Sequence, residues 1–502
     1  MTQLWHLESK RKVSLFPIFL AMEALTDNIK AIVGDADAEL RLVFKDGIYY
    51  WYDKEDDYNR LTAKYLELIL NNPNFLKDMM IQFKSIEKQF FVLCKTFKNS
   101  ANYSNEQLIN FYGQYTSLYK RMYSYSCSNW IVSRKLTPYL IDYLRKILQK
   151  QKKENKLMEY FCTFITEPRA AYAMHEQISL LKIATAIQED DQAIRLFNQN
   201  IGAIKSKLSE YKLINKMFSN HVNRFFWIGH DYENAIWTED FFIEKLKSLV
   251  NENNLNGRLI NYYKHKLELK NKVKGILLGL GVDAYHKKLF EAQRFASYLK
   301  EYRKNVHTIS FYYVSLLLKE LGKRYGYTLQ EMRFLLSSEI GQFEKIRVSK
   351  NVIRKRAQCS ISIVQRGETK IHTDVTAERL IKDTELNWKP TNELSGRCVS
   401  SGKAQGTARI ILSMDDTMHV MPGDVLIMIM PLPKYINVFL KASALVLESD
   451  EGVTSHGAIL AREAGIPAIS GVQNATKIFK NGDIIKVDAD NATIQIIKRN
   501  TI

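Results

Sequence analysis

The 502-residue chain changes its pattern of apolar residues near Gly396, and this change most constrains its fold. From about Tyr58 to Ile340, apolar residues recur every three or four positions and proline is sparse, which predicts long amphipathic helices. After Gly396, short β-forming runs alternate with glycine-containing turns, which predicts a compact domain of strands and short helices. A chain of this length exceeds one ordinary core. We therefore expect a multidomain α+β protein with a large, mostly helical N-terminal body and a C-terminal domain that mixes strands and helices.

Two further β regions flank the helical part. Residues 39–53 contain two β-rich runs around Asp46-Gly47, which is a strong hairpin signal. Residues 359–373 predict another pair of strands around a turn at Gln365-Arg366-Gly367, and residues 376–382 predict a short helix. These patterns divide the chain into an N-terminal segment with a β-hairpin (1–57), a helical body (58–347), a mixed connector and hinge (348–393) and the C-terminal domain (394–502).

The formal net charge of +18 is unevenly distributed. From Thr391 onward, 11 basic side chains balance 11 acidic ones, so the whole excess lies in the first 390 residues. A basic body could attract nucleotides, other phosphorylated substrates, RNA or an acidic partner. The simpler interpretation is a Lys-, Asn- and Tyr-rich composition with solvated helix faces. We favour it because no basic cluster is interleaved with aromatic residues, so nucleic acid is not an expected partner.

Cysteine usage and hydropathy favour a cytoplasmic protein. Five cysteines are scattered without a Cys-x-x-Cys pair, so the sequence indicates neither a metal site nor a disulfide framework. No apolar run reaches the roughly 20 residues that span a bilayer, and the N-terminus has no signal-peptide pattern. We therefore expect no membrane partner and a reducing compartment.

The segment 448–471 contains the pattern that indicates chemistry. A β-forming run leads into a glycine-containing loop, and Thr454 and Ser455 are residue types that cap the N-termini of helices. A short helical run follows, and Gly465 suits the left-handed position that ends a helix. His456 is therefore predicted to lie in the first turn of this helix, at the positive end of the helix dipole.

A histidine in that position can carry a phosphoryl group. A neutral imidazole is a competent nucleophile near pH 7, because its ordinary pKa is about 6.5. The resulting phosphoryl dianion is stabilised by the free N–H groups of a helix N-terminus, and hydroxyls such as those of Thr454 and Ser455 can add hydrogen bonds. The phosphorylated nitrogen stays a good leaving group, so one transfer is split into two. A purely structural histidine is the alternative, and the surrounding motif argues against it.

The segment resembles the mobile phosphohistidine domain of the phosphoenolpyruvate-utilising enzymes, which include phosphoenolpyruvate synthase, pyruvate phosphate dikinase and rifampicin phosphotransferase. The shared pattern is roughly G-G-x-T-S-H-A-A-I-x-A-R-E-x-G-I-P-A-V-x-G, and the resemblance extends over about residues 394–497. Two positions depart from it, Glu451 in place of the first glycine and Gly457 in place of an alanine. The resemblance implies a β/β/α swivelling fold and a phosphoryl carrier at His456. It places Thr454, Ser455, Gly452, Gly457 and Arg462 around the phosphoryl site.

The resemblance also implies partners. In this family an ATP-grasp module phosphorylates the histidine, and a barrel handles phosphoenolpyruvate or pyruvate. The sequence contains no P-loop and no stretch similar to an ATP-grasp module, and 46 residues follow His456. We therefore expect no cofactor bound by a recognisable motif, and a separate ATP-grasp protein that binds ATP and Mg²⁺ and acts as phosphoryl donor. A polar hinge at Pro390–Ser395 would let the domain move between sites.

A weaker resemblance connects the helical body with the substrate domain of rifampicin phosphotransferase. Residues 229–240 are similar to its Gly-His-Arg-Gly-x-x-Glu…Pro-Arg-Trp stretch, and residues 300–304 to its Arg-Glu section. By this resemblance, the body binds an acceptor, expected to be a small molecule with a hydroxyl group. His230 or Glu233 would take the proton of that hydroxyl. Glu301 and Arg303 would bind the acceptor, and Arg303 would neutralise the transferring charge. Helix packing and surface ion pairs are the alternative.

Three functions are consistent with these patterns. The first is a phosphotransferase subunit that joins an acceptor-binding body to a swivelling carrier. The second is a scaffold or regulatory protein that kept the fold and lost turnover, which Glu451 would favour. The third is a phosphocarrier that signals through its phosphorylation state. The aromatic residues of 225–242 would suit a ring-bearing hydroxyl compound, although such residues more often form a core.

Overall fold

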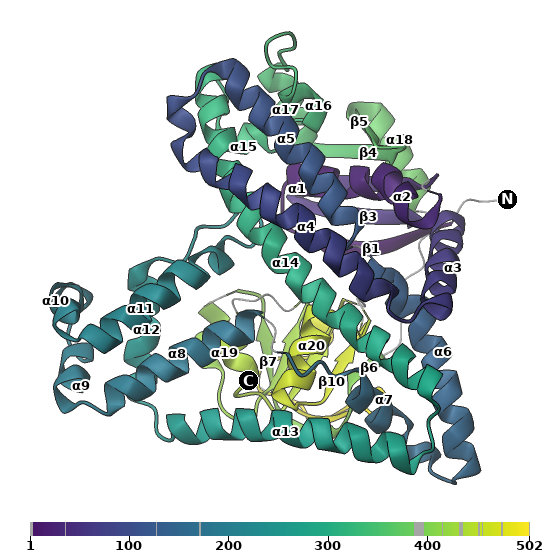
Figure 1. The fold of residues 1–502 in the computed structure, drawn as a ribbon, viewed down its shortest axis with the longest axis vertical. Coiled ribbons are helices and arrows are strands. Elements are labelled where there is room, and N and C mark those ends of the chain that lie inside the picture. The colour runs from purple at the N-terminus through teal and green to yellow at the C-terminus, as the bar shows by residue number, and fades with distance from the viewer. Residues whose placement is uncertain are drawn as a thin grey trace. The chain divides into compact units, whose positions relative to one another are not determined.

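The computed structural model describes residues 4–500, apart from 36, 127, 170–171, 386–395, 414, 431–434, 450–451, 454 and 473–474. For 128–134, 173, 436–437 and 456 it describes the backbone alone. The chain divides into two compact units, each made of two stretches of sequence (Figure 1). Unit 1 comprises Met1–Tyr143 and Lys288–Glu393, and unit 2 comprises Leu144–Lys287 and Leu394–Ile502. The expected multidomain α+β fold is confirmed.

A five-stranded antiparallel sheet forms the frame of unit 1 (Figure 1). Its order is β1-β3-β2-β4-β5, with β1 at Trp5–Arg11, β2 at Glu39–Lys45, β3 at Ile48–Lys54, β4 at Cys359–Gln365 and β5 at Glu368–His372. The predicted hairpin is the β2–β3 pair. Asp46 and Gly47 between these strands both have positive φ, 55° and 74°, as a type I′ turn requires. The predicted strand pair at 359–373 is the β4–β5 hairpin.

The segment 348–393 is not the connector that the sequence analysis expected. β4 pairs with β2 in register, with Ile361 opposite Val43 and Val364 opposite Leu40. The helix after β5, α18 at Asp374–Glu385, packs on β4 and buries Ala377. The segment is therefore a structural part of unit 1, because its apolar strand face completes the sheet that the N-terminal hairpin begins. The expected hinge at 390–395 lies outside the described residues.

Helices complete unit 1. They are α1 Phe16–Glu23, α2 Lys30–Val33, α3 Glu55–Asn71, α4 Phe75–Thr96, α5 Asn105–Ser124, most of α6 Ser128–Lys150, nearly all of α14 Ala284–Tyr325, α15 Leu329–Met332, α16 Ser337–Ile340, α17 Lys350–Gln358 and α18. α14 is 42 residues long because it contains no proline and has a single glycine, Gly322, near its end. Aromatic rings join it to α5, with the centroids of Tyr119 and Phe311 5.6 Å apart.

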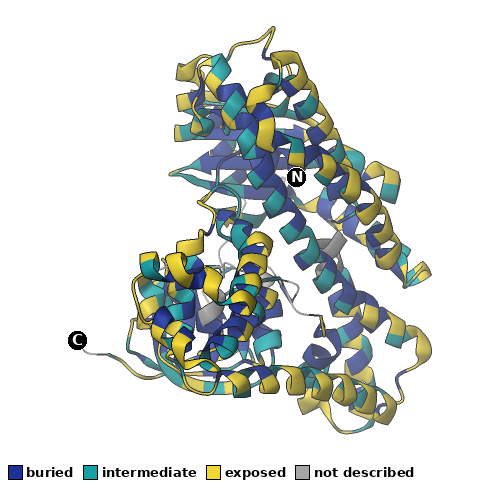
Figure 2. Ribbon diagram, turned by 60° about the vertical axis from the view of Figure 1, so that its left-hand side comes forward, coloured by how far each residue is buried: buried dark blue, intermediate teal, exposed yellow. Residues whose placement is uncertain are grey.

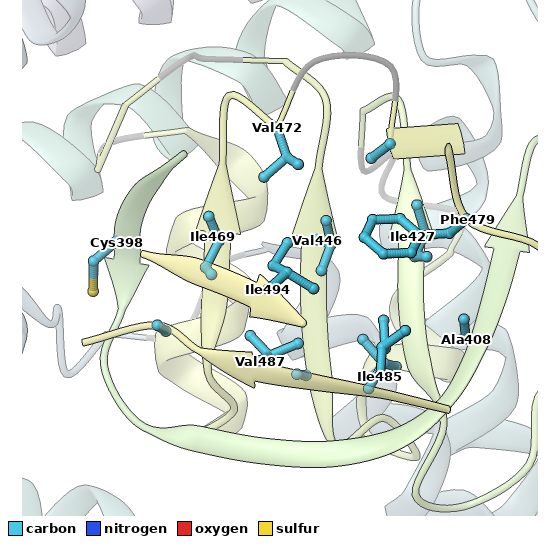
Figure 3. Close-up of a cluster of buried hydrophobic side chains, with 14 of the residues drawn as sticks. Cys398, Ala408, Ile427, Val446, Ile469, Val472, Phe479, Ile485, Val487 and Ile494 are labelled. Atoms are coloured by element: carbon cyan, nitrogen blue, oxygen red, sulfur yellow. The ribbon is translucent and has the colours of Figure 1, made fainter. Parts of the chain in front are cut away.

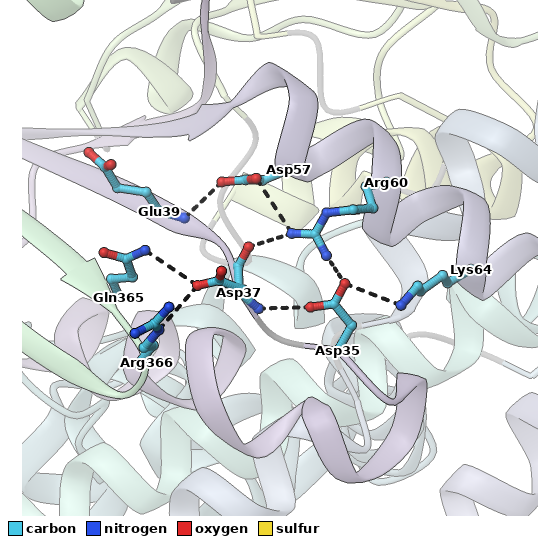
Figure 4. A network of polar contacts seen from close by, with 8 residues as sticks. All are labelled: Asp35, Asp37, Glu39, Asp57, Arg60, Lys64, Gln365 and Arg366. Carbon is cyan, nitrogen blue, oxygen red and sulfur yellow. Dashed lines mark hydrogen bonds and ion pairs between the residues drawn. The ribbon is translucent and has the colours of Figure 1, made fainter.

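A polar network orients the start of β2 (Figure 4). Arg60 of α3 donates to the carbonyl of Asp37, and the Asp57 carboxylate accepts the backbone N–H of Glu39 at 3.0 Å. From the β4–β5 turn, the Arg366 Nε lies 3.2 Å from the Asp37 carboxylate, and this hydrogen bond lowers the pKa of Asp37. Because Asp37 and Arg366 are exposed, solvent screens their attraction, and the network orients the turn more than it stabilises the fold.

A second helical group opens unit 2. It contains α7 Leu157–Ile165, α8 Tyr172–Gln188, α9 Asp191–Phe197, α10 Ile201–Lys207, α11 Lys212–Phe225, α12 Glu239–Val250 and α13 Leu255–Gly279. α9, α11, α12 and α13 all pack on α8, which is therefore the centre of the group. Throughout the described part of the chain, no helix combines the length and apolarity needed to cross a membrane.

The C-terminal domain of unit 2 is a seven-stranded sheet with short helices (Figure 1). The four central strands β7, β8, β9 and β10 run parallel, and β6, β11 and β12 add antiparallel. The order is β12-β11-β7-β8-β9-β10-β6, with β6 Arg397–Ser400, β7 Lys403–Ile411, β8 Val425–Met428, β9 Ala444–Leu447, β10 Ala468–Ser470, β11 Ile484–Asp488 and β12 Thr493–Lys498. The helices are α19 Ile436–Phe439, α20 His456–Ala464 and α21 Ala475–Ile478. The short strands predicted after Gly396 and the helix predicted to begin near His456 are confirmed.

Aliphatic side chains of these strands form the core of the domain (Figure 3). Ile427, Val446 and Ile469 come from adjacent parallel strands, and Ile485 comes from β11; all four are fully buried. Each contributes roughly 1.5–3 kcal/mol through the removal of apolar surface from water. The buried residues follow the strands, as Figure 2 shows. This core holds β9 and β10 as a rigid platform for the loop and helix between them.

Candidate functional site: the start of helix α20

The helix that begins at His456 has a well-defined N-cap. Ser455 has extended backbone angles (φ −62°, ψ 155°), and its hydroxyl accepts the N–H of Ala458 at 3.0 Å. The N–H of Ile459 donates to the Ser455 carbonyl at 3.0 Å, which starts the helical hydrogen bonding. At the other end, Gly465 has φ 69° and forms the left-handed cap. The predicted helix, its Ser455 cap and its glycine end are confirmed, and His456 is the first helical residue.

Some of the predicted site lies outside the described residues. Thr454 and Glu451 are among these, and His456 is described by its backbone alone. The position of His456 in the first turn therefore rests on the backbone of α20. There, the helix dipole favours a negative group, and the first N–H groups of the helix lack carbonyl partners from a preceding turn. The phosphoryl roles of His456, Thr454 and Ser455 stay predictions.

Described residues at both ends of the segment between β9 and α20 form hydrogen bonds within the domain. Gly452 has φ 70°, and its carbonyl accepts the N–H of Ser455 at 3.0 Å. At the end of β9, the Glu448 carboxylate accepts the backbone N–H of Thr476 at 2.7 Å and also the Thr476 hydroxyl. Gly457, in the first turn of α20, is buried. Hydrogen bonds thus connect Gly452 with the start of α20 and Glu448 with Thr476 of α21.

Arg462 lies on a different face of α20 and points into the domain. Its side chain is buried, and its Nη1 donates to the carbonyl of Val399 on β6 at 2.8 Å. Burial lowers the pKa of the guanidinium. These contacts favour a structural role that fixes α20 to β6, and support of the phosphoryl site by Arg462 stays a prediction.

His230 and Glu233 lie in the helical part of unit 2. His230 is buried at the end of a short 3₁₀ turn, and its Nδ1 lies 2.7 Å from the carbonyl of Asn234. Gly229 before it lies against Trp237, so closely that a Cβ there would come within 2.3 Å of the indole. A histidine in this loop is therefore held by the loop backbone and by Trp237.

A buried charge cluster supports the same region. Glu176 of α8 is fully buried, with Lys245 Nζ at 3.4 Å and His221 Nε2 at 3.5 Å from its carboxylate. Burial alone would raise the pKa of Glu176, but Lys245 and His221 outweigh it and keep the pKa below its usual value. Lys245 also lies 4.4 Å from the ring centre of Trp237. These contacts connect α8, α11 and α12 with Trp237, which packs on Gly229.

Glu301 and Arg303 lie on α14, in unit 1, and the structure reveals neighbours that sequence reasoning did not select. Glu301 is buried, and the Arg303 guanidinium lies 5.3 Å from the ring centre of Tyr123. Gln293, Ser297 and His307 are also buried on α14.

Together with Arg303, these side chains define the polar face of α14, and Glu301 lies at the edge of this face. In the part of the chain that the structure describes, Gln293 Nε2 and Oε1, Ser297 Oγ, Arg303 Nη1 and His307 Nε2 have no hydrogen-bond partner. Buried polar groups are almost always paired with protein, water or a ligand. The four-residue spacing from Gln293 to Ser297 and from Arg303 to His307 is the signal that could have revealed this face. The structure thus separates the predicted site residues, with His456, His230 and Glu233 in unit 2 and Glu301 and Arg303 in unit 1.

A cavity of about 470 Å³ lies at the opposite end of α20 from His456. Ile178 of α8, Arg258 and His265 of α13, and Glu463 of α20 are among its lining residues. Seven helical residues separate His456 from Glu463, which corresponds to about 10 Å along the axis. The cavity can accommodate a small molecule. The cavity therefore lies apart from the start of α20.

Comparison with known proteins identifies the C-terminal domain. Residues 420–492 match the sequence model described as PEP-utilising enzyme, mobile domain. The chain is 38% identical to an uncharacterised phosphotransferase, YvkC, of Bacillus subtilis over 109 residues, 22% of this chain and 13% of that protein. It is 32% identical to a rifampicin phosphotransferase of Bacillus cereus over 202 residues, which cover 37% of this chain and 22% of that protein. It is 40% identical to a phosphoenolpyruvate synthase of Deinococcus radiodurans over 111 residues, which cover 22% of this chain and 14% of that protein.

This domain of the chain is therefore similar to the mobile domain of the PEP-utilising enzymes. The chain spans less than a quarter of the length of each of these relatives. The match to the Bacillus cereus protein covers more residues than the C-terminal domain contains, so the similarity includes part of the chain outside that domain.

Proposed function

We propose that the chain is a phosphotransferase in which His456 carries a phosphoryl group from an ATP-dependent donor protein to a hydroxyl-bearing small molecule. The observation that carries the proposal is the start of α20, where His456 is the first residue of a Ser455-capped helix in a mobile domain of the PEP-utilising enzymes. The donor is a separate ATP-grasp protein, which binds ATP and Mg²⁺. Relatives named rifampicin phosphotransferase and phosphoenolpyruvate synthase support a phosphoryl-transfer function.

In the first step, an imidazole nitrogen of His456 attacks the phosphorus, and the bond to the nucleotide or donor oxygen breaks. The helix N-terminus and the Ser455 hydroxyl stabilise the dianion on the imidazole. In the second step, the acceptor oxygen bonds to phosphorus and the N–P bond breaks, which regenerates the neutral histidine. The acceptor hydroxyl gives its proton to a general base in this step.

The polar face of α14 is the proposed acceptor-binding surface. Its buried donors and acceptors, Gln293, Ser297, Arg303 and His307, suit a ligand with several hydroxyl or carbonyl groups. Arg303 neutralises the charge that develops on the transferring phosphoryl group. Glu301, which is buried one helical turn after Ser297, contributes to acceptor binding in this proposal.

The carrier step is tested by incubating the full chain with host lysate and either ATP or phosphoenolpyruvate, then reading intact mass for one acid-labile phosphoryl group. We expect label from ATP in the wild type and none in His456→Asn. His419→Asn is the matched control, because His419 is an exposed histidine of the same domain, and it should keep the label. Label on His456→Asn, or no label on a folded wild type in an active lysate, would contradict the proposal and favour the scaffold alternative.

The acceptor step is tested by the decay of labelled chain in small-molecule extract of the host. Arg303→Gln and Glu301→Gln should acquire label normally and lose it at least tenfold more slowly, because loss of a transition-state contact of this kind costs about 1.4 kcal/mol or more. Arg366→Gln, an exposed arginine of the same unit, should behave as wild type. Equal decay in all four proteins would contradict the acceptor surface while leaving the carrier step intact.

A further inference from the structure

The long helix α13 of unit 2 (Figure 1) exposes a line of large apolar side chains. Ile260, Tyr263 and Leu267 recur at intervals of four and three residues, and Leu278 follows three turns later, so all four lie on one face of the helix. Their exposed fractions are 58%, 49%, 63% and 63%. A single exposed leucine is ordinary on a protein surface, but apolar side chains aligned along a helix indicate an interaction site. We call this face the outer face of α13.

The helix has a second apolar face, which the fold already uses. Leu255 and Leu259 are buried, and Tyr262, Leu269 and Val273 are half-buried. These residues recur at helical spacing, and α13 packs on α7 and α8, so they form the inner face of the helix. Among the residues that the structure describes, packing therefore accounts for the inner face and leaves the outer face exposed.

Positive charge surrounds the outer face. α13 contains six Lys and Arg side chains and one acidic side chain, Glu268. Lys264 and Lys270 lie about 60° to either side of the apolar line, and Lys274 lies within it, because each residue turns the helix by about 100°. Lys264 Nζ lies 3.8 Å from the Glu268 carboxylate. In the described part of the chain, Lys270 and Lys274 have no ion-pair partner. The outer face is thus apolar along its middle and basic along its edges.

We propose that the outer face of α13 binds a partner protein through an acidic amphipathic helix of that partner. Apolar side chains of the partner helix cover Ile260, Leu267 and Leu278, and its carboxylates pair with the lysines beside them. The exposed line extends from Ile260 to Leu278, about 27 Å of helix, so the partner helix needs about five turns. This surface is separate from His456, and the proposal does not rest on phosphoryl transfer.

The charges of α13 argue against two other occupants. A second copy of the chain would bring the same basic helix against α13, and like charges in close contact are unfavourable. An anionic membrane would attract the lysines, but Lys274 is in line with the apolar side chains and would have to approach the acyl region with them. A protein helix can instead place a carboxylate opposite Lys274. An acidic helix therefore accounts for both the apolar line and the cation within it.

The surface is tested by the fluorescence anisotropy of two labelled 25-residue helical peptides mixed with the full chain. One peptide has leucine at the first and fourth positions of each heptad and glutamate beside them, and the other has lysine in place of glutamate. The wild type should bind the glutamate peptide saturably and the lysine peptide at least tenfold more weakly. Ile260→Ser combined with Leu267→Ser should weaken binding of the glutamate peptide at least tenfold. Ile81→Ser combined with Val92→Ser, which changes exposed apolar residues of α4, is the matched control and should bind as wild type.

The contribution of charge is tested by reversal. Lys270→Glu combined with Lys274→Glu should weaken binding of the glutamate peptide at least tenfold and strengthen binding of the lysine peptide. A general loss of structure cannot produce this exchange of preference. Equal binding of the glutamate peptide by all variants, or no binding by the wild type, would overturn the proposal.

Three outcomes would assign the outer face to another occupant and overturn the proposal. The first is sedimentation of the wild type, but not of the Ile260→Ser, Leu267→Ser variant, with phosphatidylserine vesicles in the absence of peptide binding. The second is a wild-type dimer in analytical ultracentrifugation that this variant dissociates. The third is a lower urea midpoint in this variant with no peptide binding by the wild type, which would mean that the chain itself covers the face. Labelling of His456 is measured separately, so its absence would count against the proposed function alone.

Discussion

At the start of α20, a single hydroxyl determines where the helix begins. Ser455 accepts the N–H of Ala458, so His456 becomes the first helical residue and occupies the end of the helix that favours negative charge. Arg462, six residues after His456 on the same helix, has structural contacts instead. Its guanidinium is buried and donates to Val399, so it connects the helix with the edge strand β6. One helix thus has the proposed carrier histidine at its start and a structural residue near its end.

Arg462→Met is expected to lower the free energy of unfolding by about 1–3 kcal/mol, because the Val399 carbonyl loses its donor in a buried setting. Urea unfolding of the full chain measures this change. Labelling of His456, measured where the variant is folded, should be unchanged.

Arg366→Met is the matched control, since that arginine is exposed and its pair with Asp37 is screened by solvent; its unfolding curve should not move appreciably. Lost labelling with unchanged stability in Arg462→Met would instead support the role at the phosphoryl site that the sequence resemblance suggested.

Among the elements, α14 is the one whose polar residues are hardest to explain by packing alone. It places the buried Gln293, Ser297 and His307 and the half-buried Arg303 on one face, where His307 contacts aromatic rings of α5. His307 stacks with Tyr123 at 5.0 Å between centroids, and burial, with a smaller contribution from Arg303, puts its pKa well below the usual value. A neutral histidine on a buried helix face is costly to charge.

Because the pKa of His307 is lowered, we expect the free energy of unfolding to decrease at acid pH. The folded-state pKa of His307 is below its unfolded value near 6.5. The contribution of His307 to the free energy of unfolding is therefore fully present above about pH 6.5 and declines as the pH falls below that value. At pH 5.5 the loss attributable to His307 is on the order of 1 kcal/mol. Urea unfolding at pH 7.5 and 5.5 should show that His307→Gln loses less stability between these values than wild type does.

His372→Gln, which changes a half-buried histidine on β5 of the same unit, is the control and should keep the pH dependence of the wild type. An equal pH dependence in His307→Gln and wild type would mean that His307 is not held neutral in the folded protein.

At the scale of the whole molecule, the division into units does not follow the order of the sequence. Each unit combines an earlier and a later stretch of the chain, and each has its own sheet and its own core. Leu42 on β2 is fully buried in unit 1, and Ile427 on β8 is fully buried in unit 2. The proposed carrier histidine and the proposed acceptor surface therefore belong to separately built cores.

Two cores of this kind are expected to unfold in two transitions. Leu42→Ala and Ile427→Ala should each cost about 2–5 kcal/mol, because each leaves a cavity in a packed core. Differential scanning calorimetry of the full chain should show each variant lowering the midpoint of one transition, a different one in the two proteins. A single transition that both substitutions shift equally would mean that the chain unfolds as one cooperative body.

The sequence by itself determined the local elements. The Asp46-Gly47 turn, the strands after Gly396, and the Ser455 cap with His456 behind it were all predictable, because turn dihedrals, strand alternation and helix capping depend on neighbouring residues. The tertiary structure alone decided which distant segments meet. The pairing of β4 with β2, the partner of Arg462 and the buried polar face of α14 depend on which apolar faces pack together. That choice minimises exposed apolar surface over the whole chain, so no local pattern could reveal it.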